Sequence, residues 1–222
     1  MRVRGAGKVI SISGFLDRTI ESYNKSAEWN SKKFDGYDWS KYLSKFVSML
    51  NGKKVLDFGC GNGRDLGFFA GKNLDCYGID YSDELLKIAK QRVPSTKISK
   101  MNFFKTLDFP SKHFDGIWAC ASILHVPQEK LSFVLSETKR VLKDDGVLFI
   151  SVKKGAGEKF IKDDFGKGER FFSLYSKDRL KKILEKSGLD VSEYFEVPDE
   201  KLRVNFTKKS TPQAWLLFYC KK

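Results

Sequence analysis

The sequence has few cysteines and no long apolar run. Its 222 residues include only four cysteines, Cys60, Cys76, Cys120 and Cys220, and none of them belongs to a C-x-x-C pair. This scatter argues against a zinc site and favours a reducing compartment. No apolar run approaches the ~20 residues of a membrane span, and residues 1–14 lack the apolar core of a signal peptide. We therefore expect a cytoplasmic protein with no metal and no membrane contact.

Acidic residues are too few to balance the basic ones. There are 41 lysines and arginines against 28 acidic residues, a net charge of +13. Such an excess raises the prospect of an anionic partner such as RNA. The basic residues are dispersed in doublets, for example Lys53-Lys54 and Lys181-Lys182, and most doublets have acids nearby. A solvated lysine-rich surface is therefore favoured over a nucleic-acid footprint, although RNA stays open as a partner.

The most informative stretch runs from Val55 to Asp65. It begins as a short apolar run typical of a buried strand and continues through Gly59, Gly61 and Gly63 into a helical pattern. Glycines at alternate positions allow a sharp turn against which a ligand can lie without meeting a Cβ atom. The helix that follows presents unpaired backbone N–H groups. The stretch predicts a cofactor site.

Two carboxylates indicate which cofactor this is. The glycine spacing differs from the G-x-G-x-x-G pattern of dinucleotide-binding proteins, so a nucleotide-dependent oxidoreductase is a distant alternative. Asp57 precedes the turn and would repel a pyrophosphate, but it suits the cationic amine and sulfonium of S-adenosylmethionine. Asp80 ends the next strand-like run, 17 positions after Gly63, close to the ~20-residue offset of a carboxylate that binds ribose hydroxyls.

With these motifs the chain resembles the class I S-adenosylmethionine-dependent methyltransferases, from about Tyr23 to the C-terminus. The resemblance extends to Leu107–Pro110, to Phe114–Pro127 and to Leu142–Leu148. It looks like a subgroup of small, mostly uncharacterised bacterial and archaeal enzymes. It implies a Rossmann-like three-layer α/β sandwich with a mostly parallel seven-stranded sheet and an antiparallel C-terminal strand. It also implies S-adenosylmethionine as cofactor, S-adenosylhomocysteine as product, and no metal.

The resemblance and the motifs together predict a set of cofactor-binding residues. Asn102 stands where related enzymes often have an acidic residue that binds the adenine amino group, and its amide oxygen can accept the same hydrogen bond. Tyr23 is expected to close over the cofactor from an N-terminal helix, although plain core packing explains it equally well. The predicted cofactor residues are Tyr23, Asp57, Gly59, Cys60, Gly61, Asp80, Tyr81, Asn102, Phe103 and Ala119.

The pattern along the chain predicts one domain at residues 15–222 after a disordered tail at 1–14. Apolar spacing predicts helices over 15–29 and 39–50, and strands and helices alternate from Lys54 onward. Polar and glycine-containing residues 153–168 are expected to form a mobile loop. The N-terminal helices and residues 153–170 would then form the lid. Final antiparallel strands are expected at 191–197 and 213–220.

The sequence marks the residues that would catalyse methyl transfer or bind the acceptor less clearly. His125 follows the fourth strand and is the best candidate for a general base, because imidazole titrates near neutral pH. A structural histidine bonded to the turn before Pro127 is the alternative. Cys120 lacks the preceding Pro or Thr of pyrimidine C5 methyltransferases, so a buried thiol is expected there. Lys153, Arg170 and Tyr175 are predicted to form an acceptor pocket for an anionic or aromatic substrate.

Three functions remain in competition. The first is methyl transfer from S-adenosylmethionine to a small molecule, and the second is methylation of tRNA or rRNA. The third is a non-catalytic module that keeps the fold, which the complete set of Asp57, the glycines and Asp80 disfavours. The acceptor, the methylated atom and the oligomeric state are not encoded in any motif of the chain.

Overall fold

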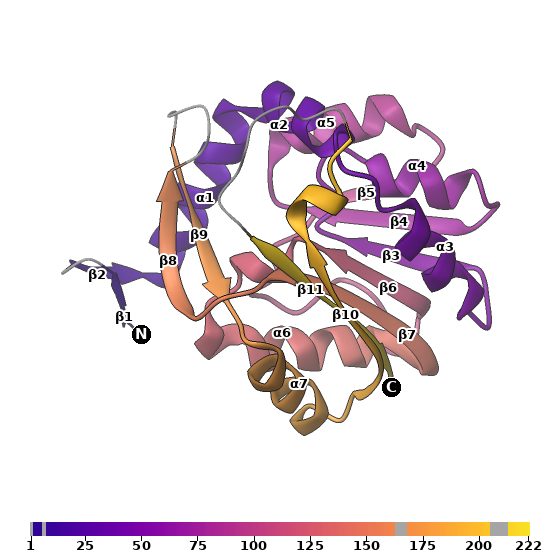
Figure 1. Cartoon of the computed structure of the whole chain (residues 1–222). Helices are drawn as coiled ribbons and strands as arrows, with labels where there is room; N and C mark the ends of the chain where they lie inside the picture. The colour runs from indigo at the N-terminus through magenta and orange to yellow at the C-terminus, as the bar shows by residue number, and fades with distance from the viewer. Residues whose placement is uncertain (1, 6–7, 163–167, 205–212) are drawn as a thin grey trace.

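The computed structural model describes residues 2–5, 8–162, 168–204 and 213–222, with side chains described from residue 14 onward. Seven strands form one sheet in the order β10-β11-β7-β6-β3-β4-β5 (Figure 1). Their bounds are β3 Lys54–Phe58, β4 Asp75–Asp80, β5 Lys97–Lys100, β6 Phe114–Cys120, β7 Leu142–Lys153, β10 Asp190–Pro198 and β11 Ala214–Lys221.

The direction of the strands confirms the predicted fold class. β3 pairs in parallel with β4 and β6, β4 with β5, and β6 with β7. β11 is antiparallel to both of its neighbours, β7 and β10. Parallel strands place their carboxyl ends at one edge of the sheet, which is where ligands bind in such folds.

Helices cover both faces of this sheet and give the three layers (Figure 1). α3, α4 and α5 lie on one face, and α6 and α7 lie on the other. Serine side chains cap two of these helices: Ser82 Oγ accepts from Leu85 N at the start of α5, and Ser176 Oγ accepts from Arg179 N at the start of α7. The bounds are α3 Ser40–Ser48, α4 Arg64–Ala70, α5 Asp83–Arg92, α6 Gln128–Val141 and α7 Lys177–Lys186.

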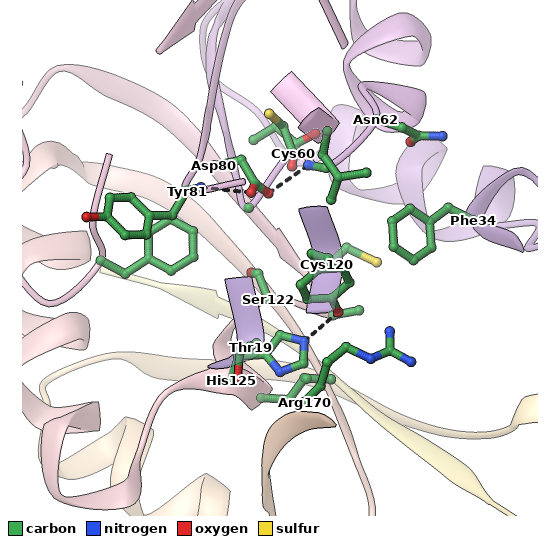
Figure 2. A pocket seen from close by; sticks show the side chains of 18 of the residues that line it. Thr19, Phe34, Cys60, Asn62, Asp80, Tyr81, Cys120, Ser122, His125 and Arg170 are labelled. Atoms are coloured by element: carbon green, nitrogen blue, oxygen red, sulfur yellow. Dashed lines mark hydrogen bonds between the residues drawn. The ribbon is translucent and has the colours of Figure 1, made fainter. Parts of the chain in front are cut away.

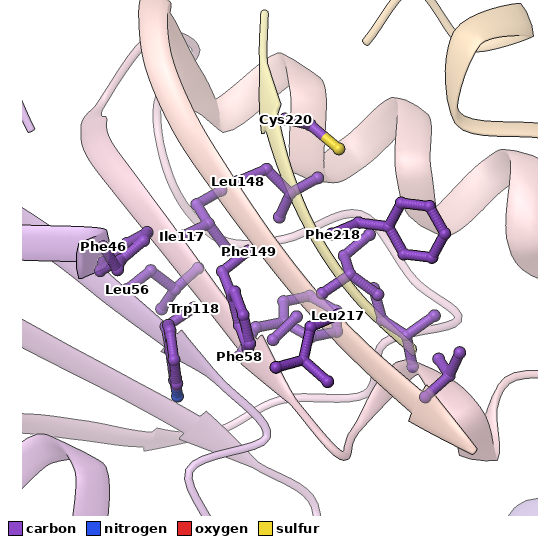
Figure 3. Close-up of a cluster of buried hydrophobic side chains, with 14 of the residues drawn as sticks. Phe46, Leu56, Phe58, Ile117, Trp118, Leu148, Phe149, Leu217, Phe218 and Cys220 are labelled. Carbon is purple, nitrogen blue, oxygen red and sulfur yellow. The ribbon is translucent and has the colours of Figure 1, made fainter. Parts of the chain in front are cut away.

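The core lies between the central strands and the helices. Trp118 of β6 stacks on Phe149 of β7 with ring centroids 3.7 Å apart, and Phe46 of α3 meets the same indole at 5.3 Å (Figure 3). All three side chains are fully buried. Burial of such aromatic groups contributes on the order of 2–3 kcal/mol each, so the core holds the strand ends around the turn rigidly.

The N-terminal region differs from the prediction in two ways. β1 (Arg2–Gly5) pairs with β2 (Lys8–Ser11), where a disordered tail was expected. The single helix expected over 15–29 is two helices, α1 (Ile12–Lys25) and α2 (Ala27–Asp35). The break falls at Ser26, whose hydroxyl donates to Ser22 O instead of capping α2.

The stretch expected to be a loop is instead a hairpin. β8 (Gly157–Lys162) pairs antiparallel with β9 (Glu169–Leu174), while residues 163–167 lie outside the described chain. Aromatic and β-branched residues explain the strands: Phe160 of β8 lies opposite Phe171 of β9, and the two rings are 5.6 Å apart. The charged residues between them concealed this alternation in the sequence.

Candidate functional site

A cavity of about 190 Å³ lies at the carboxyl ends of β3, β4, β6 and β7, beneath α1 and α2. Helix α1 is held over it at two points. Asn24 Oδ1 accepts from Ser82 Oγ at 2.7 Å, and Thr19 Oγ1 accepts from Phe171 N at 3.0 Å. The helix therefore links the start of α5 to β9 across the opening. The walls include Tyr23, Phe34, Asp57, Gly59, Gly61, Arg64, Asp80, Tyr81, Phe103, Ser122, His125, Lys153, Arg170, Phe172 and Trp215.

The glycine turn requires glycine for two separate reasons. Gly59, Gly61 and Gly63 all have positive φ angles, of 85°, 52° and 76°, a region that L side chains rarely adopt. At Gly59 a Cβ atom would also lie 2.4 Å from the Cβ of Ser122. The turn therefore brings bare backbone against Ser122, just after the end of β6.

Asp57 is a buried carboxylate with an unused oxygen. Its side chain is 2% exposed, and Oδ2 has no hydrogen-bond partner among the described residues. Burial, with the nearby charges of Asp65 and Asp80, raises the pKa of Asp57 well above its usual value. Such a carboxylate would attract a cationic ligand, because a positive charge would offset both the loss of solvation on burial and the repulsion from Asp65 and Asp80.

Asp80 holds the backbone of the turn in place. Its Oδ2 accepts from Gly61 N at 2.9 Å, and its Oδ1 accepts from Tyr81 N at 2.7 Å (Figure 2). Oδ1 also accepts from Ser82 N at 2.9 Å. Burial raises the pKa of Asp80, and these three N–H donors oppose that rise. The carboxylate is thereby fixed at the cavity wall, and it keeps lone pairs that these three bonds do not use.

Arg64 and Asp65 form a buried ion pair behind the turn. Arg64 Nε donates to Asp65 Oδ1 at 2.6 Å, and Trp118 Nε1 donates to Asp65 Oδ2 at 2.8 Å. Arg64 Nη1 also donates to Phe34 O at 2.6 Å. These contacts connect the start of α4 to β6 and α2, so Phe34 is held at the cavity wall.

The remaining predicted cofactor residues divide into two groups. Cys60, Tyr81 and Phe103 line the cavity, and the Phe103 ring stacks on Phe58 with centroids 4.2 Å apart. Asn102 and Ala119 do not line it. Asn102 Oδ1 accepts from Phe104 N at 2.8 Å, so its amide caps the local turn, and Ala119 is buried within β6. Neighbours further along the chain, Phe103 and Cys120, reach the cavity in their place.

His125 and Tyr23 meet at the opposite side of the cavity. The Tyr23 hydroxyl lies 2.7 Å from His125 Nε2, and Phe171 O lies 2.6 Å from Nδ1 of the same ring. A carbonyl oxygen only accepts, so Nδ1 carries the proton and Nε2 accepts from Tyr23. Burial, together with the charges of Arg170 and Lys153, lowers the pKa of His125 to about 3, although the bond to Phe171 O acts in the opposite direction. The imidazole is therefore neutral, with its basic nitrogen facing the cavity.

Of the three residues predicted to bind the acceptor, two reach the cavity. Arg170 of β9 is 7% exposed and Lys153 ends β7, and both line the wall. Tyr175 does not; it is fully buried beside the first turn of α7. In Figure 2, Arg170 and His125 lie at one end of the cavity and Asp80 at the other. The cavity thus has an acidic half and a basic half.

The sequence of residues 56–150 matches a family described as a methyltransferase domain. The chain belongs to the class I S-adenosylmethionine-dependent methyltransferase family. The matched residues run from β3 to β7, so this methyltransferase domain includes the glycine turn, Asp57, Asp80 and His125.

Similar proteins agree with this assignment. Methyltransferase GfsG of Streptomyces halstedii is 31% identical over 176 residues, which is 74% of this chain and 63% of that protein. A ubiquinone biosynthesis O-methyltransferase of Glaesserella parasuis is 34% identical over 50% of this chain and 49% of that protein. The methyltransferase domain therefore spans about half to two thirds of the length of these curated relatives.

A solved structure shares the fold along the whole chain. It is the Burkholderia thailandensis 1,6-didemethyltoxoflavin-N1-methyltransferase with bound 1,6-didemethyltoxoflavin and S-adenosylhomocysteine. The TM-score is 0.77 at 16% identity, and the match covers 100% of this chain and 93% of that one. At this low sequence identity, the match shows that the two proteins share a fold and nothing more.

Several residues of the cavity wall were not predicted as site residues. Arg64 directly follows the glycine turn and Phe172 lies two positions after Arg170, so sequence proximity was a usable signal for both. Phe34 and Trp215 carried no such signal, because only the packing of α2 and β11 brings them to the cavity. In the described part of the chain, no three His, Cys, Asp or Glu side chains gather as metal ligands, and no helix has the length and apolarity to cross a bilayer.

Proposed function

We propose that this protein transfers a methyl group from S-adenosylmethionine to a small-molecule acceptor. The observation that carries the proposal is the buried Asp57 carboxylate, whose Oδ2 lacks a partner beside the glycine turn. A cationic amine at this point would provide the missing donor and offset the buried charge. Gly59 fits the same proposal. Its backbone is left-handed, and a Cβ atom there would clash with Ser122, so the turn stays free of side chains at this point.

The other wall residues fit the rest of such a cofactor. Asp80 is held by three backbone N–H groups and presents its free lone pairs to hydroxyl donors. Phe103 offers a ring face for a flat base and is itself supported by Phe58. Ser122 Oγ is buried without a partner among the described residues and lies against the turn, so it adds a further polar contact.

The residues of this chain contribute mainly alignment and a proton acceptor. Bound S-adenosylmethionine supplies an already activated methyl group for in-line displacement. Helix α1 covers the cavity and excludes water, which favours a defined approach of the acceptor. His125 is held neutral with Nε2 toward the cavity, so it can accept a proton from an acceptor hydroxyl once Tyr23 moves aside.

The walls support a small acceptor better than RNA. Aromatic side chains from four separate elements bound the space, among them Tyr23, Phe34, Phe172 and Trp215. Many surface lysines pair with acids, as Lys45 does with Glu193 and Lys154 with Glu196, so the excess charge is spread over the surface. A single catalytic domain over residues 15–222 is part of the proposal, because one seven-stranded sheet organises the described chain. The four free cysteines suit a reducing compartment, which supports a place in the cytoplasm.

Calorimetric titration with S-adenosylmethionine, S-adenosylhomocysteine and NAD tests the proposal. We expect the first two to bind and NAD not to bind. Asp80→Asn should weaken binding of both by at least about tenfold, because a charged acceptor is lost. Asp75→Asn is the matched control, since Asp75 begins the same strand and pairs with Lys97 on the surface. Binding of NAD alone would refute the assignment of the cofactor. Equal affinities of the wild type and Asp80→Asn for S-adenosylmethionine would refute the assignment of the site.

A further inference from the structure

The basic half of the cavity contains a buried guanidinium that lacks a carboxylate partner in the part of the chain that the structure describes. Arg170 is 7% exposed, and its Nε has no hydrogen-bond partner among the described residues. No described Asp or Glu forms an ion pair with it, whereas its neighbour Glu169 pairs with Arg18. A buried charge without a counterion is costly, so a bound anion would stabilise this arrangement.

Aromatic rings fix the direction of this guanidinium. Its Cζ lies 5.1 Å from the centroid of the Tyr23 ring and 6.0 Å from that of Phe172. The guanidinium points into the cavity beside His125 (Figure 2). Packing against two rings holds a planar group in one orientation. The Nε–H is buried and has no acceptor among the described residues, so a bound anion that reached it would supply the missing partner.

A second cation lies near the same ring. Lys153 Nζ is 5.0 Å from the centroid of Phe172 and 5.8 Å from that of Trp215. The imidazole of His125 also contacts Phe172, with ring centroids 4.8 Å apart. Phe172 thus adjoins both cations and the candidate base. This side of the cavity carries positive potential, while Asp57 and Asp80 lie on the other side.

We infer that Arg170, assisted by the charge of Lys153, binds a carboxylate group of a flat, aromatic methyl acceptor. The edge of a guanidinium matches the two oxygens of a carboxylate with parallel hydrogen bonds. The surrounding rings accommodate a flat body, and His125 Nε2 lies within the same cluster to receive a hydroxyl proton. This inference rests on the proposed function, since it names the acceptor class of that site.

The first test compares 4-hydroxybenzoate with its uncharged amide, 4-hydroxybenzamide. Both are titrated calorimetrically into the protein with and without S-adenosylhomocysteine. We expect the acid to bind at least about tenfold more tightly than the amide, the strength of a charged hydrogen-bonded pair. Arg170→Gln should abolish the preference and Arg170→Lys should retain part of it. Arg179→Gln is the control, because Arg179 is an exposed arginine of α7 bonded to Gln128.

The second test needs no tight acceptor. The NMR signal of the Arg170 Nε–H group, assigned by its loss in Arg170→Gln, is followed during titration with benzoate and with benzamide. Benzoate should shift the signal and benzamide should not. No shift with benzoate up to its solubility limit, or equal shifts with both, would overturn the inference. Binding of S-adenosylhomocysteine is measured on the same samples, so a failure of the cofactor site is recognised separately from a failure of the carboxylate site.

Discussion

Tyr23 and His125 are joined across the cavity by a hydrogen bond of 2.7 Å between the tyrosine hydroxyl and Nε2 of the imidazole. Tyr23 belongs to α1, and His125 ends the short 3₁₀ turn Ile123–His125 that follows β6. The same bond occupies the only basic nitrogen of the ring, because Nδ1 donates to Phe171 O. Closure of α1 and access to the base are therefore coupled.

Substitution of Tyr23 by Phe should loosen α1 without removing its apolar packing. A net hydrogen bond contributes about 1 kcal/mol, so opening of the helix should become about fivefold more frequent. Hydrogen–deuterium exchange of residues 14–25 measures this. Tyr37→Phe is the matched control, since the Tyr37 hydroxyl bonds to Asp199 Oδ1 at 3.2 Å, a partner outside α1. Unchanged exchange in Tyr23→Phe, or equal acceleration in both variants, would show that the bond does not hold the helix.

The fold and the acidic half of the site could be read from the sequence because local patterns determine them. The strand, the alternate glycines and Asp57 are contiguous, and Asp80 ends the next strand. Parallel pairing of β3 with β4 then brings the two carboxylates together at one edge. Such a relation follows from chain order and strand direction alone.

The lid and the basic half depend on contacts that chain order does not specify. Arg170 reaches the cavity because β9 pairs with β8 and packs against α1, whereas the sequence indicated a loop. Tyr175, five positions further on, enters the core instead. Asn102 was assigned by analogy, but its side chain bonds to its own turn. Tertiary packing decided each of these positions.

A comparison of substitutions at Gly59 and Gly157 separates the cost of backbone strain from the cost of a steric clash. Both have positive φ, 85° and 78°, but a Cβ at Gly157 would meet nothing within 4 Å, whereas at Gly59 it would lie 2.4 Å from Ser122 Cβ. Gly157→Ala should lower the free energy of unfolding by about 1 kcal/mol, from strain alone. Gly59→Ala should lower it by about 2–4 kcal/mol, because overpacking is added. Urea denaturation of both variants measures the difference, and equal losses would disprove the close approach.

His125 should make the protein less stable as the pH falls below about 6.5. Its pKa is about 3 in the folded chain and near 6.5 when unfolded, so only the unfolded state takes up this proton between those values. Stability contributed by the neutral ring is then lost as the pH falls, by up to about 1.5 kcal/mol between about pH 6.5 and 5. In His125→Gln this component of the pH dependence should disappear, as judged by urea denaturation at several pH values.

His113→Gln provides the comparison for that measurement. Burial also lowers the pKa of His113, but its ring lies near the protein surface, so we expect a smaller change in the pH dependence. If His125→Gln and the wild type lose stability in parallel on acidification, His125 is not held neutral by burial.

Asp57 should make cofactor binding release protons. Burial and neighbouring carboxylates raise its pKa well above the usual value in the free protein, and a bound cationic amine would lower it again. The ionised form binds the cation, so affinity should rise with pH until the raised pKa is passed. Titration calorimetry of S-adenosylhomocysteine in two buffers of different ionisation enthalpy should detect net proton release. Asp57→Asn should bind at least about tenfold more weakly and release no proton, while Asp75→Asn should behave as the wild type. Proton uptake, or equal release in Asp57→Asn, would place the cationic end of the ligand elsewhere.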